Sequence, residues 1–297
     1  MSLPKGILAA CVTAMNEDES INFENNAKLY ERVIRGGVHG LFCLGTTGEF
    51  YAMTAEEKVA VVENAVKVAA GRVPVYAGVG AVSTGEVISL IKKMDHLDIA
   101  GYSVVSPFFI TPSQDEIVAH YTKIAASTDK PILLYNIPGR TNLNIDPETV
   151  GKLCGIENIV GIKDSSGNFD NLTAYLKYKS DNFAVMAGSD GFIHDILKLG
   201  GTGAIAATSN IATKMVAGIY NEFVKGNLEK SKELQDRLAP LRNILNSGTV
   251  PGVLKACVNV MGVNVGPSRM PIEKTKPELY AKLQETMKEY YSDEFEN

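Results

Sequence analysis

Short apolar runs alternate with longer segments of helical periodicity along residues 1–224, and turn residues separate the two kinds of segment. The runs are rich in β-branched and small apolar residues, a composition typical of β-strands. Eight runs are therefore predicted to be strands: Gly6–Thr13, Gly40–Leu44, Val75–Val79, Tyr102–Val105, Ile132–Tyr135, Ile159–Lys163, Phe183–Ala187 and Gly203–Ala206.

Amphipathic helices are predicted between these strands. In the segment Thr54–Ala70, five apolar residues share one helical face: Val59, Val62, Ala65, Val66 and Ala69. The same period predicts helices over three more segments: Ser113–Ser127, Pro147–Cys154 and Phe192–Leu199. Eight strand and helix units in series predict parallel strands, and their closure makes a (β/α)8 TIM barrel, a fold of about 250 residues.

The pattern changes after Val224, where strand-like runs stop. Three helices are predicted in this part of the chain: Asn227–Asn246, Pro251–Met261 and Pro277–Tyr291. No linker rich in Pro, Gly or Ser separates them from the preceding residues, so they are expected to pack on the barrel. We therefore predict a catalytic barrel over residues 1–224 and a three-helix C-terminal extension over residues 225–297.

Composition narrows the class of protein. The 297 residues are 45% hydrophobic and 21% charged, as in ordinary globular proteins with a large core. A net charge of -5, with both signs interspersed, offers no basic stripe for nucleic acid. The apolar stretches fall short of the roughly 20 residues that cross a bilayer, and no signal peptide is evident. We expect a cytoplasmic protein with neither nucleic-acid nor membrane partners.

The cysteines and histidines show no metal-binding pattern. The four cysteines are far apart in the sequence, without a C-x-x-C pair or a neighbouring histidine. They are interpreted as small buried residues in a reducing compartment: Cys11, Cys43, Cys154 and Cys257. The four histidines are equally scattered, so no metal site is expected.

Lys163 is the first candidate for chemistry, because it ends the apolar run that starts at Ile159. In a parallel barrel the carboxyl ends of the strands line the active-site mouth. Burial there disfavours the ammonium form, and the neutral amine is the form that attacks a ketone. Tyr135 ends the preceding run in the same way, and its phenol can exchange protons with a neighbouring carbonyl adduct. The alternatives are a lysine that extends to solvent and a core tyrosine with its hydroxyl at the rim.

Two loops offer sites for carboxylates. The sequence GTTGE, residues 45–49, brings the hydroxyls of Thr46 and Thr47 and glycine-flanked amides to the end of a strand. It is equally consistent with a polar turn before a helix capped by Thr54. Arg140 can bind a second carboxylate with two parallel hydrogen bonds, or it can be a solvated loop residue.

One group of charged residues is assigned no role in the chemistry. Glu56, Glu57 and Lys58 are interpreted as a solvated helix face.

Four motifs occur in order over essentially the whole chain: GTTGEF (45–50), YNIPGRT (135–141), GIKDSSGN (161–168) and ATSN (207–210). Together they resemble the dihydrodipicolinate synthase and N-acetylneuraminate lyase family of class I aldolases. The resemblance implies a (β/α)8 barrel, usually a homotetramer. It also implies a Schiff base between a lysine and pyruvate or another 2-oxo acid, without metal or other cofactor.

The resemblance also assigns roles to the candidate residues. It makes Lys163 the Schiff-base lysine and Tyr135 the phenol that transfers protons. Thr46 and Thr47 match the residues that hold the carboxylate of the 2-oxo acid, and Thr46 also belongs to the proton relay.

Two further positions match residues that contact substrates in the family. Ile205 matches a position whose backbone carbonyl faces the bound keto acid. Arg140 matches the arginine that binds the carboxylate of the aldehyde in dihydrodipicolinate synthases.

Two stretches depart from the family pattern. Both subgroups usually carry a tyrosine after the fourth strand that reaches a neighbouring subunit's site, whereas this chain has Phe108 and Phe109. A phenylalanine side chain has no hydroxyl group, so it cannot transfer protons in the relay. Gly188, Ser189 and Asp190 replace the acidic pair of the synthases, and a serine beside an aspartate can meet the hydroxyls of a sugar acid.

The leading hypothesis is a lyase that condenses pyruvate with aspartate semialdehyde, a step of lysine biosynthesis. The alternative enzyme is an aldolase or dehydratase of 2-keto-3-deoxy sugar acids, or a sialic acid lyase. A third hypothesis is a barrel that binds 2-oxo acids as a sensor without turnover, because fold alone does not determine function.

Overall fold

The computed structural model describes residues 3–295, and its centre is a closed barrel of eight parallel strands in chain order. The strands are β1 (Gly6–Ala10), β2 (Gly40–Cys43), β3 (Val75–Gly78), β4 (Gly101–Val105), β5 (Ile132–Asn136), β6 (Ile159–Asp164), β7 (Ala184–Ala187) and β8 (Gly203–Ala206). Every predicted strand is present, and each predicted end lies within three residues of the observed one. The predicted (β/α)8 barrel is confirmed.

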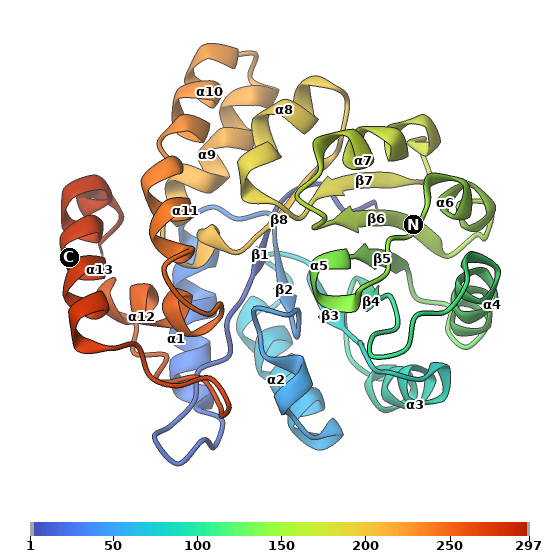
Figure 1. Cartoon of the computed structure of the whole chain (residues 1–297), viewed down its shortest axis with the longest axis horizontal. Helices are drawn as coiled ribbons and strands as arrows, with labels where there is room; N and C mark the ends of the chain where they lie inside the picture. The colour runs from blue at the N-terminus through green and yellow to red at the C-terminus, as the bar shows by residue number, and fades with distance from the viewer. Residues whose placement is uncertain (1–2, 296–297) are drawn as a thin grey trace.

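Helices surround the barrel, as Figure 1 shows. They are α1 (Phe23–Arg35), α2 (Ala55–Ala69), α3 (Thr84–Met94), α4 (Gln114–Ala125), α5 (Pro138–Thr141), α6 (Pro147–Leu153), α7 (Phe169–Ala174), α8 (Ile193–Lys198) and α9 (Thr213–Val224). The four helices predicted between strands match α2, α4, α6 and α8, with ends within two residues of the prediction.

The core has two parts, one inside the barrel and one between the strands and the helices. The inner part contains seven residues: Leu8, Ala10, Phe42, Tyr76, Leu133, Met186 and Ile205. The outer part is larger and includes the apolar faces of the surrounding helices. Because both faces of each strand are buried, the strands appear in the sequence as continuous apolar runs.

Three helices begin with a capping box directly after a polar loop: α2 with Thr54 and Glu57, α3 with Ser83 and Glu86, α4 with Ser113 and Glu116. In α2 the Thr54 side chain accepts from the Glu57 amide, so the predicted cap is confirmed. The interpretation of Glu57 as solvated was wrong. Both oxygens of its carboxylate accept from the guanidinium of Arg269, at 2.8 and 2.5 Å. Arg269 is far away in the sequence, so helical periodicity could not reveal this contact.

The described C-terminal residues form four α-helices instead of the predicted three: α10 (Leu228–Asp236), α11 (Ala239–Leu245), α12 (Gly252–Val260) and α13 (Pro277–Tyr290). Figure 1 shows them, coloured orange to red, on one side of the barrel. The single helix predicted over residues 227–246 was wrong. Pro240 lacks an N–H, and the Tyr291 hydroxyl accepts from the Leu241 amide at 3.0 Å while it donates to the Arg237 carbonyl at 2.8 Å. This hydroxyl takes the place of one helical hydrogen bond, which breaks the helix.

The cysteines are free thiols in the structure. Cys11, Cys43 and Cys257 are buried, as predicted, whereas Cys154 is partly exposed. Burial raises the pKa of Cys257 to about 12, so its thiol stays protonated. These thiols therefore serve as small packing groups.

Two features of residues 3–295 bear on the class of protein. No helix there combines the length and apolar character that crossing a membrane requires. No three His, Cys, Asp or Glu side chains of this part of the chain gather as metal ligands.

His120 on α4 generates a prediction about stability. Its Nδ1 lies 2.8 Å from the Thr84 hydroxyl, and burial lowers its pKa to about 4. The unfolded histidine has a pKa of about 6.5, so the unfolded chain binds a proton first as the pH falls. The free energy of unfolding should have its full value above about pH 6.5. It should fall by about 3 kcal/mol in total as the pH decreases toward 4. Urea unfolding of His120→Asn should show much less of this loss. The control is His96→Asn at an exposed site, and parallel curves for wild type and His120→Asn would contradict the prediction.

Candidate active site

Lys163 and Tyr135 occupy paired positions at the carboxyl ends of β6 and β5. Each is only 4% exposed, and the Lys163 Nζ lies 4.1 Å from the centroid of the Tyr135 ring. The prediction that the two side chains lie side by side is confirmed, and a lysine extended to solvent is excluded. Phe42 of β2 forms another wall, with its ring centroid 4.7 Å from the same Nζ. Sequence reasoning missed Phe42 because it belongs to an ordinary apolar run.

Gly188, at the end of β7, leaves the space that Lys163 needs. A Cβ atom at this position would lie 3.0 Å from the Lys163 Cε and 2.0 Å from the Ser165 Oγ. The Gly188 amide also donates to the Asp164 carbonyl at 2.7 Å. A side chain at residue 188 would therefore displace the Ser165 hydroxyl and crowd Lys163, so Gly188 has a packing role in addition to its predicted contact with substrate.

Asn136 and Asp164 directly follow Tyr135 and Lys163, and they join β5 to β6. The Asn136 amide donates to the Asp164 carboxylate at 2.8 Å, and both residues are buried. Asp164 also accepts from the Ser166 hydroxyl at 2.7 Å. Burial raises the pKa of Asp164, and these hydrogen bonds partly offset the effect. The pair holds the two strand ends, and so the two candidate side chains, in a set relation.

The loop between β2 and α2 brings Thr46 to Tyr135. The Thr46 Oγ1 lies 3.4 Å from the Tyr135 hydroxyl, where either group can donate. The loop is closed by the Glu49 amide, which donates to the Thr46 carbonyl at 3.2 Å. On the barrel side, the Thr13 hydroxyl donates to the Gly48 carbonyl at 2.8 Å. Thr47 is half-buried in the same turn.

The loop between β2 and α2, which contains Thr46 and Thr47, is called the threonine loop. A cavity of about 260 Å³ connects it with Arg140 of α5. Nine residues line it: Thr46, Phe50, Tyr51, Val105, Phe108, Ile137, Arg140, Thr141 and Val250. Burial raises the pKa of Tyr51 to about 12, so its phenol stays protonated. Phe109, in contrast, is 94% exposed and has a φ of 76°. The structure thus brings Thr46 and Arg140 to one cavity, whereas the Phe109 side chain is exposed on the surface.

The remaining candidates lie at the ends of β7 and β8. Asp190 is 9% exposed, and its carboxylate accepts from the Thr208 amide at 2.7 Å. Burial raises its pKa despite this bond. Ser189 is half-buried beside it, and the Ile205 side chain belongs to the core inside the barrel. Substrate contacts of Ser189, Asp190 and Ile205 stay predictions.

A (β/α)8 barrel with a buried lysine beside a tyrosine at its mouth has the features expected of a class I aldolase. The chain belongs to the Dihydrodipicolinate synthetase family, whose model matches residues 3–290. It is therefore an enzyme, a carbon–carbon lyase of the class I aldolase type, and the sensor without turnover is rejected.

Individual relatives agree with this membership. The chain is 36% identical over 266 residues to 4-hydroxy-tetrahydrodipicolinate synthase 1 of Halalkalibacterium halodurans, which is 90% of both proteins. The crystal structure of a dihydrodipicolinate synthase from Bacillus anthracis is 33% identical, with a TM-score of 0.92 over 97% of this chain and 99% of that one. The chloride-inhibited dihydrodipicolinate synthase of Acinetobacter baumannii in complex with pyruvate is 31% identical, with the same TM-score and coverage.

The Asn136–Asp164 pair generates a prediction about stability and its pH dependence. Asn136→Ala removes a buried donor from Asp164, so the free energy of unfolding should fall by about 2 kcal/mol. Burial raises the pKa of Asp164 in the folded protein, so its charged form is populated above that pKa and destabilises the fold when a donor is missing. This destabilisation disappears as the pH falls, because the carboxyl group becomes neutral. Urea unfolding should therefore show a larger loss at pH 8 than at pH 5.

Asn171→Ala is the matched control, because this half-buried amide also donates to Asp164, at 3.3 Å. It should cost less stability than Asn136→Ala. Equal losses in the two variants, or a loss for Asn136→Ala that is independent of pH, would contradict the prediction.

Proposed function

We propose that this chain condenses pyruvate with aspartate semialdehyde through a Schiff base on Lys163, as 4-hydroxy-tetrahydrodipicolinate synthases do. The main support is the buried Lys163, in register with Tyr135 and with its Nζ 4.1 Å from the Tyr135 ring. The names of the relatives, and the pyruvate complex of the Acinetobacter baumannii enzyme, agree with this proposal.

The first stage is formation of the Schiff base. The free amine of Lys163 attacks the keto carbon of pyruvate, and the carbonyl oxygen takes up a proton to give a carbinolamine. The Tyr135 phenol gives and takes back protons while this oxygen leaves as water. Thr46, 3.4 Å from the Tyr135 hydroxyl, connects the phenol to its relay. Thr46 and Thr47 hold the pyruvate carboxylate in this scheme, and the Ile205 carbonyl faces the bound acid.

The second stage forms the carbon–carbon bond. The iminium acidifies the methyl group of pyruvate, which loses a proton and leaves an enamine. The enamine carbon attacks the aldehyde, whose oxygen is protonated. The amino group of aspartate semialdehyde then attacks the new iminium carbon, which closes the ring and releases the Lys163 amine. The Arg140 guanidinium binds the carboxylate of the aldehyde across the cavity that it shares with Thr46. The lysine itself carries the carbon chain, so the scheme uses no cofactor.

A second candidate reaction is cleavage or dehydration of a 2-keto-3-deoxy sugar acid, or of a sialic acid. The half-buried Ser189 beside Asp190 favours it, because a serine hydroxyl suits a polyhydroxylated substrate. Phe109 in place of a relay tyrosine favours the 2-keto-3-deoxy sugar acid, because the synthases and the sialic acid lyases both usually carry that tyrosine. For either reaction we propose a cytoplasmic homotetramer, in which a neighbouring subunit covers the exposed Phe109.

Trapping of the Schiff base tests the proposal directly. Borohydride added to the enzyme with pyruvate should attach a reduced pyruvyl group to the peptide that contains Lys163, as peptide mass spectrometry would detect. Lys163→Arg should abolish the adduct, whereas Lys177→Arg at an exposed site should not. Absence of the adduct from the wild-type enzyme would sink the proposed chemistry.

Arg140 provides a test of the aldehyde. Arg140→Ala should raise the KM for aspartate semialdehyde by about 10- to 100-fold, the value of a lost charge-assisted hydrogen bond. Trapping with pyruvate should be unaffected, since Arg140 binds the other substrate. Faster turnover of 2-keto-3-deoxy sugar acids than of aspartate semialdehyde by the wild type would instead support the second candidate.

A further inference from the structure

A buried ion pair connects α12 to the threonine loop. The Lys255 Nζ lies 2.9 Å from the Glu49 Oε1, and the two residues are 1% and 0% exposed. The other carboxylate oxygen of Glu49 accepts from the Arg269 amide at 2.9 Å, and Lys255 also donates to the Pro267 carbonyl. A buried charge that loses its partner is strongly unfavourable, so the pair keeps α12 and Glu49 together.

The backbone around the threonines is held in an unusual conformation. Leu44 and Glu49 flank the turn, and both have a φ of 59°. Residues other than glycine rarely adopt this left-handed conformation, and it persists only when the surrounding contacts enforce it. The Glu49 amide donates to the Thr46 carbonyl at 3.2 Å, so the position of Glu49 also sets that of Thr46.

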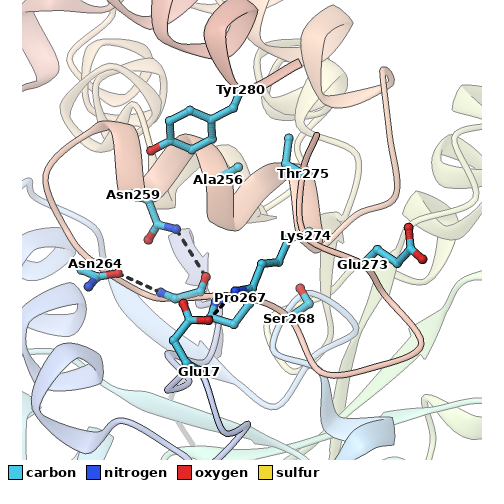
Figure 2. Close-up of a pocket in the computed structure, with 12 residues that line it drawn as sticks. Glu17, Ala256, Asn259, Asn264, Pro267, Ser268, Glu273, Lys274, Thr275 and Tyr280 are labelled. Carbon is cyan, nitrogen blue, oxygen red and sulfur yellow. Dashed lines mark hydrogen bonds and ion pairs between the residues drawn. The ribbon is translucent and has the colours of Figure 1, made fainter. Parts of the chain in front are cut away.

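Residues 266–270 form a strap that runs along this loop. Besides Glu57, the Arg269 guanidinium contacts the Ala52 carbonyl at 2.6 Å and the Glu19 carbonyl at 2.9 Å. Pro267 and Ser268 of the strap line a cavity of about 210 Å³. Figure 2 shows them across from Ala256 and Asn259, which belong to α12. None of the predicted site residues lines that cavity, whereas the Arg269 amide of the strap donates to Glu49.

We propose that Glu49 and Lys255 are positioning residues for pyruvate. They hold the turn so that Thr46 and Thr47 present their hydroxyls and amides to the pyruvate carboxylate, with Thr46 within reach of Tyr135. The inference rests on the proposed function. It makes the predicted C-terminal extension a working part of the active site, since Lys255 and the strap both belong to it.

The test uses Lys255→Met, Glu49→Gln and the double variant in the full-length enzyme. Lys255→Met leaves a buried carboxylate without its cation, so the pyruvate concentration for half-maximal trapping on Lys163 should rise about tenfold. Trapping at saturating pyruvate should still reach the wild-type level, because Lys163 and Tyr135 remain. Glu49→Gln should show a smaller rise. The double variant should recover most of the loss of Lys255→Met, because it has no unpaired charge.

A control separates positioning from general stability. Asn158 precedes β6 at the opposite end of the barrel, where its amide donates to the carbonyls of Ala125 and Thr128 at 2.9 and 2.8 Å. Asn158→Ala should lower the unfolding temperature without changing the pyruvate dependence. An unchanged dependence in folded Lys255→Met, or an equal shift in Asn158→Ala, would overturn the inference. If Lys255→Met does not fold, an unchanged dependence in Glu49→Gln would have the same meaning.

Amide hydrogen exchange of residues 44–52 gives a readout that needs no pyruvate. Exchange there should be faster in Glu49→Gln than in the wild type and unchanged in Asn158→Ala. Equal exchange in wild type and Glu49→Gln would contradict the positioning role of Glu49 even if pyruvate never binds. A wild-type enzyme that forms no adduct would refute the proposed function instead, so the two failures are distinguishable.

Discussion

Closure of the parallel barrel is the constraint on which the rest of the structure depends. Pairing of β1 with β8 brings all eight carboxyl ends to one rim, so residues far apart in the sequence share a single site. The β5–β6 register then sets Tyr135 opposite Lys163. A slip of one residue would turn one of these side chains to the other face of its strand. The chemistry of the site therefore depends on backbone hydrogen bonds that involve none of its side chains.

Three carboxylates are buried near the barrel mouth. Asp164, Asp190 and Glu49 are each almost fully buried, and each carboxylate accepts a hydrogen bond from another segment of the chain. Such groups destabilise a protein when they lose their partners, so each forces two segments of the chain to stay in contact. These contacts hold the segments of the barrel mouth together, which suits a reaction that requires lysine, phenol and carboxylate in set positions.

Aromatic residues shape the cavity where the second substrate is proposed to bind. Phe50, Tyr51 and Phe108 line it together with Arg140. The Phe50 and Phe108 rings pack edge to face, with their centroids 6.1 Å apart. One cation in largely apolar walls favours an aldehyde that carries a single carboxylate. The polar end of the mouth at Ser189 favours hydroxyls instead. The two candidate reactions differ in which of these two walls the second substrate contacts.

The sequence by itself determined the strands, the barrel and the leading site residues. Strands buried on both faces are apolar throughout, so Lys163 and Tyr135 stood out as polar ends of apolar runs, and strand order alone made them neighbours. Local signals also identified the Thr54 cap, because a capping box lies within four residues.

Only the tertiary structure decided contacts between distant segments. The Tyr291 hydroxyl breaks the helix predicted over residues 227–246, Arg269 binds Glu57, and Lys255 pairs with Glu49 from more than two hundred residues away. Phe42 and Asn136 likewise gained their places beside Lys163 and Asp164 from packing. Periodicity records which face of an element is buried. It carries no record of the partner on that face, because burial depends on polarity and partner choice depends on three-dimensional shape.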